Sequence, residues 1–144
     1  MKHKTLGQVF TPEWIVKEIL DLVRFRGKNL LDKKIIDPSC GDGAFLKEIV
    51  SRIIDKCIEL GYENKKILDL IQANVFGIEI DKLEYENCLI NLNKIVNKKL
   101  SIDSKIEWNI INGDTLVSYK QFVNYFDFVV GNPKVDLLFH GAGN

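Results

Sequence analysis

One stretch of the chain decides the fold: it reads Asp37-Pro38-Ser39-Cys40-Gly41-Asp42-Gly43-Ala44-Phe45-Leu46, directly after the apolar pair Ile35-Ile36. The pattern predicts a strand, a glycine turn and the start of a helix. Gly41 and Gly43 reach backbone angles closed to other residues and carry no side chain, so a ligand can lie directly on the main chain. The helix that follows directs free N–H groups and the positive end of its dipole toward that ligand. A tight strand-to-helix turn without a ligand is the alternative interpretation.

The acidic residue at the end of the strand restricts which ligand the turn accepts. Asp37 argues against a phosphate at this position and favours a ligand that carries an ammonium group or hydroxyls. The dinucleotide fingerprint G-x-G-x-x-G also fails, because Leu46 stands in place of its third glycine. The sequence therefore predicts a ligand site of another kind at this turn.

The length and composition are those of one globular domain. The chain has 144 residues, of which 46% are apolar and 28% charged, and 20 basic residues balance 20 acidic ones. This balance gives no overall basic field that would hold nucleic acid by charge alone, so a contact with DNA has to be local or lie outside this chain. No apolar run reaches the roughly 20 residues of a membrane span, and the basic start leads into no secretory core. We expect a cytoplasmic protein without a membrane partner.

The cysteines predict neither a disulfide nor a zinc site. Cys40, Cys57 and Cys88 are an odd number, without metal-ligand spacing or nearby histidines. Cys57 and Cys88 fall on the apolar faces of predicted helices and are expected to be small core residues. Cys40 lies in the glycine turn, where its backbone is expected to matter more than its thiol.

Helical and strand patterns alternate along the chain. Because each pair of strands is separated by a helix, the strands are expected to be parallel and joined by right-handed crossovers. We predict helices at residues 12–24, 44–60, 64–72 and 82–98, and strands at residues 33–37, 75–80, 105–111 and 125–130.

The first helix has the residues of a helix start. Thr11 is predicted to be a hydroxyl N-cap, Pro12 to occupy the first helical position and Glu13 to lie in the first turn. Its apolar face and its stop are also predicted: the face consists of Ile15, Ile19, Leu22 and Val23, with Val16 and Leu20 at its border, and the stop is Gly27.

Four predicted strand ends carry polar or glycine-rich groups. Ligands of open parallel sheets bind beyond the carboxyl ends of the strands, where the strand order switches, so these groups are expected to converge on one crevice. They are Asp37, Glu79-Ile80-Asp81, Asn112-Gly113-Asp114 and Gly131-Asn132-Pro133.

Five segments resemble, in their order and spacing, the motifs of adenine-N6-specific DNA methyltransferases of the restriction-modification type. The resemblance is to the class whose cofactor-binding half precedes its DNA-target domain, and it covers residues 5–133. It implies a Rossmann-like α/β sheet with helices on both faces and S-adenosylmethionine as the cofactor. The segments are Gly7-Gln8-Val9-Phe10-Thr11-Pro12, Asp37 to Leu46, Gly77-Ile78-Glu79-Ile80-Asp81, Asn112-Gly113-Asp114 and Gly131-Asn132-Pro133.

The resemblance implies which residues hold the methionine part of the cofactor. Thr11, with the neighbouring helix N-terminus, would bind the methionine carboxylate. Asp37 and the main chain of Cys40 and Gly41 would hold the rest, with Gly43 as the second glycine of the turn. A plain helix cap is the alternative role of Thr11, and both roles are compatible.

The nucleoside part of the cofactor would be held by the later motifs. By the same resemblance, Glu79 would accept hydrogen bonds from both ribose hydroxyls, Ile80 would pack on the adenine ring, and Asp114 would accept from its exocyclic amine. The alternative for Glu79 and Asp114 is a solvated or helix-capping acid. Asp81 is expected to cap the helix that begins at Lys82.

Asn132 and Pro133 would carry the chemistry. The lone pair of the adenine amine is delocalised into the ring, so catalysis needs acceptors for its protons, and the Asn132 side-chain oxygen and the Pro133 carbonyl are such acceptors. The target base must first leave the duplex. In the family, a second proline and an aromatic residue that stacks on the base come next, whereas this chain has Lys134 and Val135. We therefore expect the chain alone to be weak or inactive.

The motifs predict a cofactor-binding and catalytic domain at residues 1–133, truncated after the fourth strand, and a divergent tail at residues 134–144. The adenine target in DNA would be selected by a target-recognition domain that this chain lacks. The apolar fourth strand invites a completing chain or a restriction partner. Two other functions stay open: a non-catalytic module that binds S-adenosylmethionine or completes a partner, and a methyltransferase that acts on a protein glutamine or an RNA base.

Overall fold

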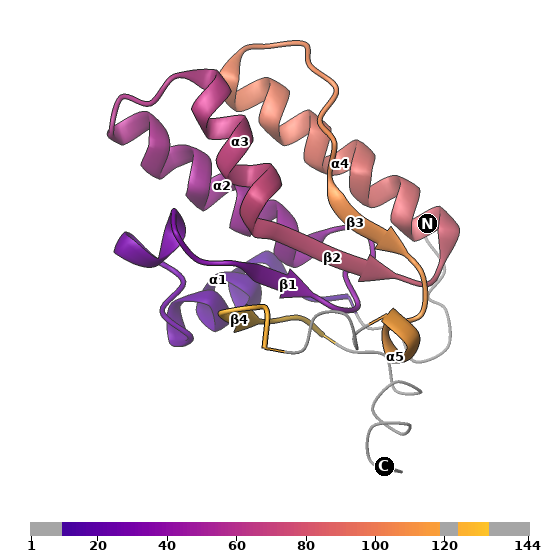
Figure 1. Ribbon diagram of the computed structural model, residues 1–144. Helices are drawn as coiled ribbons and strands as arrows, with labels where there is room; N and C mark the ends of the chain where they lie inside the picture. The colour runs from indigo at the N-terminus through magenta and orange to yellow at the C-terminus, as the bar shows by residue number, and fades with distance from the viewer. Residues whose placement is uncertain (1–9, 119–123, 133–144) are drawn as a thin grey trace.

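The computed structural model describes residues 10–118 and 124–132, which form helices around a parallel sheet (Figure 1). Within these ranges, no helix combines the length and the apolar character needed to cross a membrane. The helices are α1 (Glu13–Leu22), the 3-10 helix η1 (Gly27–Leu30), α2 (Ala44–Glu59), α3 (Asn64–Asn74), α4 (Lys82–Leu100) and the short α5 (Thr115–Ser118). The strands are β1 (Ile35–Asp37), β2 (Val75–Glu79), β3 (Asn109–Asn112) and β4 (Phe128–Val129).

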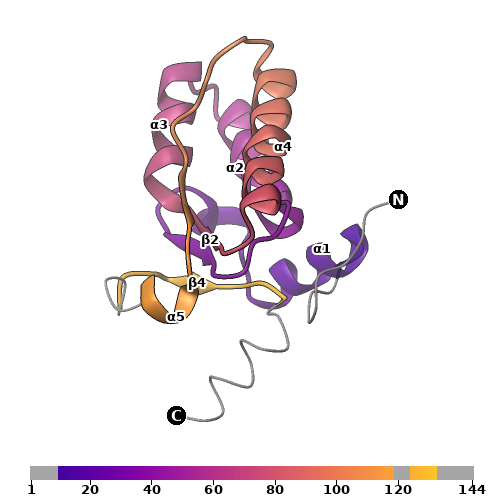
Figure 2. The same cartoon turned by 90° about the vertical axis from the view of Figure 1, so that its right-hand side faces the viewer.

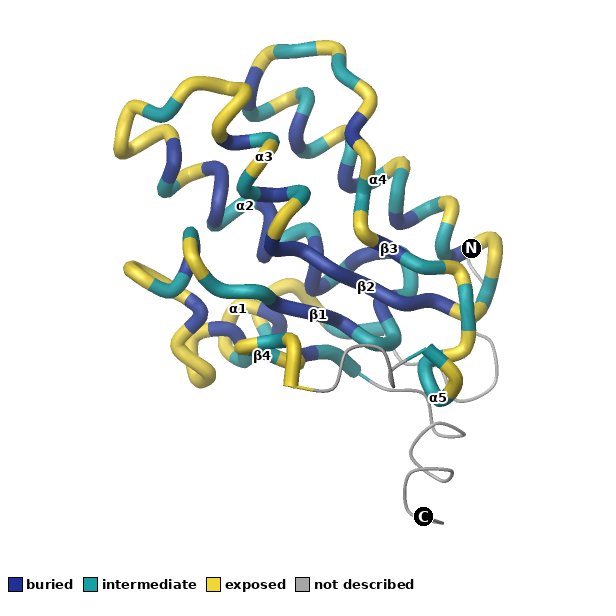
Figure 3. Tube along the Cα trace, viewed as in Figure 1, coloured by how far each residue is buried: buried dark blue, intermediate teal, exposed yellow. Residues whose placement is uncertain are grey.

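The four strands form one parallel sheet in the order β3-β2-β1-β4. In its register Ile35 lies opposite both Val75 and Phe128, and Gly77 lies opposite Ile110. β1 and β2 are central and buried along their whole length, as the dark tube in Figure 3 shows. This confirms the predicted α/β class with a Rossmann-like parallel sheet, and it places the carboxyl ends of the strands at one edge.

The main core is built on α2. Leu46, Ile49 and Ile53 are buried at helical spacing and join one cluster with residues of α1, α3, α4 and one face of the sheet. Figure 2 shows α2, α3 and α4 gathered together, with α1 below them beside β4. A smaller cluster that includes Ile36 and Phe76 lies on the opposite face, and none of the described helices contributes a residue to it.

Two predictions about individual side chains are confirmed. Asp81 is the N-cap of α4, and its Oδ1 accepts the N–H of Glu84 at 3.0 Å. Cys57 and Cys88 are fully buried and belong to the main core.

The first helix begins one residue later than predicted. Pro12 is its N-cap, and no side chain caps it. The Pro12 carbonyl accepts the first helical hydrogen bonds, from Ile15 and Val16, both at 3.1 Å. The hydroxyl of Thr11 instead accepts a hydrogen bond from the Asn132 side chain. The predictions of Thr11 as the N-cap and of Pro12 in the first helical position are therefore wrong.

The predicted apolar face of α1 is also wrong. Val16 and Leu20, expected at its border, are fully buried, whereas Leu22 is 76% exposed and Val23 40% exposed. The other two residues of the predicted face are half-buried. Apolar side chains cover a wide arc of this helix, so the sequence pattern alone could not decide which part of the arc would pack against α2.

The end of α1 does not need Gly27. The helix ends at Leu22, and Arg24 then takes a left-handed φ of 64°. The N–H of Phe25 donates to the carbonyl of Leu20 at 2.9 Å, which is the long hydrogen bond of a Schellman turn. Gly27 is instead the first residue of η1, so its prediction as the helix stop is wrong.

The third and fourth strands are shorter than predicted, beginning at Asn109 and Phe128 rather than at residues 105 and 125. Tyr125 and Phe126 instead turn their rings edge-on to the Phe76 ring, with centroid distances of 5.6 Å and 4.9 Å. Aromatic packing thus takes up apolar residues that the sequence assigns to a strand. The other boundaries agree within two residues, while η1 and α5 were not predicted.

Candidate functional site

A cavity of about 180 Å³ opens beside the glycine turn at the carboxyl end of β1. It adjoins two others through shared lining residues: one of about 310 Å³ between α1 and α2, and one of about 280 Å³ beside β4. The residues predicted for the site that line the first cavity are Thr11, Asp37, Cys40, Gly41 and Asn132.

Asp37 is a buried carboxylate in the wall of this cavity. It is 1% exposed, and its Oδ1 accepts the N–H of Ser39 at 3.0 Å. Burial raises the pKa of this carboxyl to about 7; the Ser39 hydrogen bond opposes the rise, and the neighbouring Glu79 carboxylate adds to it. Within the described part of the chain no cation forms an ion pair with Asp37. The position therefore favours a cationic group from a ligand.

The backbone after β4 packs directly against Asp37. Gly131 has a φ of 146°, and a methyl group there would collide with Oδ1 of Asp37 and lie 2.9 Å from its Cγ. Glycine is therefore required at this position for two reasons, its backbone angle and the space beside the carboxylate. This close approach brings the segment that carries Asn132 to the end of β1.

Both glycines of the turn have left-handed backbone angles, with φ of 56° at Gly41 and 99° at Gly43. The N–H of Gly41 donates to Oε1 of Glu79 at 2.8 Å. A methyl group at Gly43 would lie 3.1 Å from Sγ of Cys88, so α4 packs directly on the turn. Gly41 is one of the lining residues of the cavity, whereas Gly43 is buried against Cys88 in the protein core.

Cys40 holds the turn together through its main chain. Its N–H donates to the Ile78 carbonyl at 3.0 Å, and its carbonyl accepts the N–H of Gly43 at 2.9 Å. Its thiol is buried beside Cys88, whose side-chain hydrogen bond, followed by burial, raises the pKa of Cys40. The wall of the cavity at Cys40 is thus fixed by backbone contacts on both sides.

Glu79 joins three loops at the carboxyl edge of the sheet. Its buried carboxylate accepts the N–H of Gly41 through Oε1 and the N–H of Asp81 through Oε2, both at 2.8 Å. Its main-chain carbonyl accepts the N–H of Gly113 at 3.0 Å. The segments after β1, β2 and β3 are therefore connected through this one residue.

Ile80 and Asp114 lie close to this junction but do not line the cavity. Ile80 is 57% exposed. Asp114 is exposed, and its Oδ1 accepts the N–H of Leu116 at 2.9 Å at the start of α5. The next residue, Thr115, donates its hydroxyl to the carbonyl of Pro38, which holds this loop against the glycine turn.

Asn132 contacts the segment before α1. Its Nδ2 donates to Oγ1 of Thr11 at 2.8 Å, a hydrogen bond between residues 121 positions apart. The Thr11 hydroxyl keeps its own hydrogen to donate, and Asn132 keeps Oδ1 as an acceptor. Pro133, the other residue predicted to carry chemistry, lies outside the described residues, as do residues 7–9 of the first motif.

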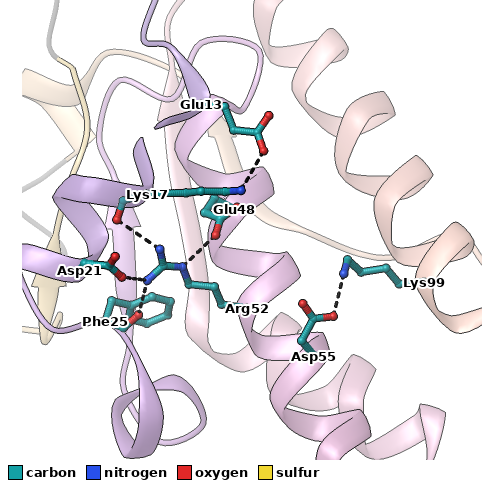
Figure 4. A network of polar contacts seen from close by, with 8 residues as sticks. All are labelled: Glu13, Lys17, Asp21, Phe25, Glu48, Arg52, Asp55 and Lys99. Atoms are coloured by element: carbon teal, nitrogen blue, oxygen red, sulfur yellow. Dashed lines mark hydrogen bonds and ion pairs between the residues drawn. The ribbon is translucent and has the colours of Figure 1, made fainter. Parts of the chain in front are cut away.

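A network of ion pairs holds α1 against α2 beside the second cavity (Figure 4). The Arg52 guanidinium contacts Glu48 at 2.9 Å and Asp21 at 2.8 Å. It also donates to the main-chain carbonyls of Lys17, in α1, and of Phe25, after the end of α1. Lys17 pairs with Glu13 at 3.2 Å. The two acidic residues that line the second cavity, Glu13 and Glu48, thus both have cationic partners.

Two lining residues of the first cavity belong to none of the predicted motifs: Lys47 and Glu84. Each lies in the first turn of a helix that follows a predicted motif, Lys47 in α2 and Glu84 in α4. That position was the available signal, because the first turns of these helices lie at the carboxyl edge of the sheet. The direction of each side chain depends on helix packing and could not be read from the sequence.

The sequence comparisons match this chain to one family and to two methyltransferases of that kind. A sequence model of the N-6 DNA Methylase family matches residues 1–141. The Type II methyltransferase M.BstVI of Geobacillus stearothermophilus is 37% identical over 138 residues, which cover 91% of this chain and 25% of that protein. The Type II methyltransferase M.XhoI of Xanthomonas vasicola is 26% identical over 132 residues, covering 88% of this chain and 24% of that protein. The chain therefore spans about a quarter of the length of these relatives.

Solved structures share the fold. The ATP-dependent Type ISP restriction-modification enzyme LlaBIII, in a structure bound to DNA, matches with a TM-score of 0.62 and 21% identity, over 76% of this chain and 8% of that chain. The cryoEM structure of the DrdV–DNA complex matches with a TM-score of 0.54 and 21% identity, over 77% of this chain and 11% of that chain. At these identities the likeness concerns the fold.

Proposed function

Because this chain belongs to the N-6 DNA methylase family, we propose that it supplies the cofactor-binding and catalytic part of an adenine-N6 DNA methyltransferase. The reaction is transfer of a methyl group from S-adenosylmethionine to N6 of an adenine in DNA, in a restriction-modification system. When bound, the cofactor supplies an electrophilic methyl group on a sulfonium. The rest of the chemistry is the task of the chain's own residues.

The residues around the first cavity fit the methionine part of this cofactor. Asp37 offers a buried carboxylate without a cationic partner in the described chain, which suits the ammonium group. The Thr11 hydroxyl accepts from Asn132 and still has a hydrogen to donate, which suits the carboxylate. Cys40 and Gly41 form the wall between them, and Gly43 lets α4 support the turn. The volume of about 180 Å³ matches part of the cofactor rather than all of it.

We assign the nucleoside part to the edge of the sheet beside this cavity. The Glu79 carboxylate accepts the N–H groups of Gly41 and Asp81, which fix its orientation at this edge, and we assign the ribose hydroxyls to it. The exposed side chain of Ile80 offers an apolar surface for the adenine ring. Asp114 caps α5 through Oδ1, which leaves Oδ2 to accept from the exocyclic amine.

Asn132 would position the target amine. The donor Nδ2 is fixed by Thr11, so Oδ1 is directed away from that contact and can accept a hydrogen bond from the adenine amine. This hydrogen bond orients the amine so that its lone pair can face the methyl group. We assign the second acceptor to the carbonyl of Pro133. The contact between Asn132 and Thr11 would also keep the target base beside the methionine part of the cofactor.

The partner in this proposal is DNA, with the target adenine turned out of the duplex. The chain covers about a quarter of the length of M.BstVI and M.XhoI, and we assign the choice of DNA sequence to a target-recognition domain outside it. The proposed activity places the protein in the cytoplasm. A completing chain or a restriction partner at the edge strand β4 is part of the same proposal.

The hydrogen bond between Asn132 and Thr11 is the observation that carries the proposal, because it joins the proposed catalytic and cofactor-binding motifs at one cavity. The test has two stages. Isothermal titration with S-adenosylhomocysteine measures cofactor binding, and tritiated S-adenosylmethionine with unmethylated DNA, followed by nucleoside analysis, measures formation of N6-methyladenine.

We expect binding of the cofactor and slow methylation of adenine. The variant Asn132→Ala should keep binding and lose transfer, whereas the matched control Asn64→Ala, on an exposed residue of α3, should change neither. Binding without transfer would indicate a damaged enzyme half, whereas binding with no transfer even in Val135→Tyr would favour the non-catalytic module. Transfer to RNA or to a protein glutamine, but not to DNA, would refute the proposed substrate.

A further inference from the structure

The first and second cavities meet at three residues, Thr11, Ala44 and Lys47, which line both. Lys47 lies in the first turn of α2 and is half-buried. Among the described residues that line either cavity it is the single cation, whereas the carboxylates of Asp37, Asp42 and Glu84 line the first cavity. A lone ammonium group at the junction therefore has a specific place in the charge pattern of the site.

The acidic residues nearest to Lys47 in the sequence and in the second cavity are engaged by other cations. Glu48 pairs with Arg52 at 2.9 Å, and Glu13 pairs with Lys17 at 3.2 Å (Figure 4). Lys47 itself forms no ion pair or side-chain hydrogen bond within residues 10–118 and 124–132. A half-buried lysine buries its apolar stem and keeps its ammonium group in the water of the cavity, where an anionic group of a ligand can reach it.

The lining of the first cavity therefore includes a buried carboxylate, Asp37, and a lysine, Lys47, and neither forms an ion pair within the described residues. This arrangement is complementary to an α-amino acid group, which carries an ammonium and a carboxylate on one carbon. The Thr11 hydroxyl lies in the same junction and has a hydrogen to donate.

We propose that Lys47 binds the carboxylate of the amino-acid part of the cofactor, together with the Thr11 hydroxyl. This rests on the proposed function, and it adds a residue that lies outside every motif of the sequence. Lys47 acts here as a specificity residue: it makes the site select ligands that carry the carboxylate. A charge-assisted hydrogen bond of this kind corresponds to about a 10- to 100-fold difference in affinity.

The experiment compares two ligands that differ in one group. S-adenosylhomocysteine carries the carboxylate, and its decarboxylated counterpart, S-adenosyl-3-thiopropylamine, keeps the ammonium group but lacks the carboxylate. Both are titrated calorimetrically at pH 8 into the full chain, into Lys47→Met and into the control Lys94→Met, whose lysine is exposed on α4. Methionine keeps most of the apolar stem of lysine, and thermal unfolding checks that the variants are folded.

The unaltered chain and the control should bind S-adenosylhomocysteine about 10- to 100-fold more tightly than the decarboxylated ligand. In Lys47→Met the affinity for S-adenosylhomocysteine should fall by that factor, and the affinity for the decarboxylated ligand should stay the same. Equal binding of both ligands by the unaltered chain would overturn the inference, as would a preference in Lys47→Met as large as that of the unaltered chain. Those two outcomes leave cofactor binding intact, whereas no binding of either ligand to the unaltered chain would also refute the proposed function.

Discussion

The substitution Asp37→Asn should stabilise the fold at alkaline pH while removing cofactor binding. Asp37 is 1% exposed, no cation in the described chain pairs with it, and burial raises its pKa from 3.8 to about 7. An asparagine has nearly the same shape and can still accept the N–H of Ser39. It has no charge that burial would penalise, and no charge that would attract an ammonium group.

The effect on stability depends on pH in a defined direction. Because the folded-state pKa of Asp37 lies above its ordinary value, the folded chain holds the proton more tightly than the unfolded chain. The stability contributed by this proton is fully present below pH 3.8 and is lost as the pH rises through 7. Each pKa unit corresponds to about 1.4 kcal/mol, so the whole shift is on the order of 4 kcal/mol, of which about 3 kcal/mol is lost between pH 5 and pH 8.

The assay is urea unfolding of the unaltered chain and of Asp37→Asn at pH 5 and at pH 8. The gain in unfolding free energy of the variant should be about 3 kcal/mol larger at pH 8 than at pH 5. The control Asp103→Asn removes one negative charge from an exposed side chain, and it corrects for the change in net charge. A gain that is the same at both pH values would refute the reasoning, because it would mean that Asp37 is not held protonated by burial.

Ligand binding gives an independent measurement of the same group. Only the ionised carboxylate pairs with an ammonium group, so the affinity of the unaltered chain for S-adenosylhomocysteine should decrease as the pH falls below about 7. The variant Asp37→Asn should bind weakly at every pH. Affinity that stays constant from pH 8 to pH 5.5 would contradict the assignment of Asp37 to the ammonium group.

Three further results are expected. Gly131→Ala would direct a methyl group at Asp37 from a backbone with φ of 146°. It should lower the unfolding free energy by about 1–3 kcal/mol and weaken binding of S-adenosylhomocysteine. Unchanged binding would argue against the close packing of the segment after β4 on the site. Arg52→Met removes the ion pairs between α1 and α2, so chemical unfolding should show a loss of about 1.5–3 kcal/mol, and full stability would contradict the importance of the network. Val135→Tyr restores the stacking residue of the family, and the rate of DNA methylation should rise about 10- to 100-fold, whereas an unchanged rate would mean that the aromatic ring is not what limits transfer.

The central elements of the fold could be predicted because each carries a strong local pattern. α2 repeats buried residues at helical spacing, and β2 is apolar on both faces, so the predicted limits of both agree with the structure within one residue. The face of α1 could not be predicted, because its apolar arc is wider than the surface that α2 covers. The start of β4 was missed because Tyr125 and Phe126 have strand-forming side chains but pack as rings on Phe76.

In the site, too, the sequence predicts which residues lie at the carboxyl edge of the sheet but not the contacts that their side chains make. Asp37 lies opposite Gly77 in the sheet, so Glu79, two residues later, projects from the same face at the same edge, and this could be expected from strand geometry. The contacts of the Glu79 carboxylate with two backbone N–H groups could not be expected, because they depend on how the turns at Gly41 and Asp81 bend. The position of Lys47 could not be predicted, because it lines a cavity that forms only when α1 packs on α2.

The charges of the described chain give a physical reason to look for the ligand at this cavity. At the contact between α1 and α2, the acidic residues Glu48 and Asp21 are both paired with Arg52. Asp37 and Lys47 line the same cavity with no ion pair in the described residues, and burial makes the first of them a destabilising group above pH 7. A fold that needed only stability would gain from a neutral side chain at Asp37. Opposite charges kept apart in one cavity are instead what a zwitterionic ligand requires, since it neutralises both when it binds.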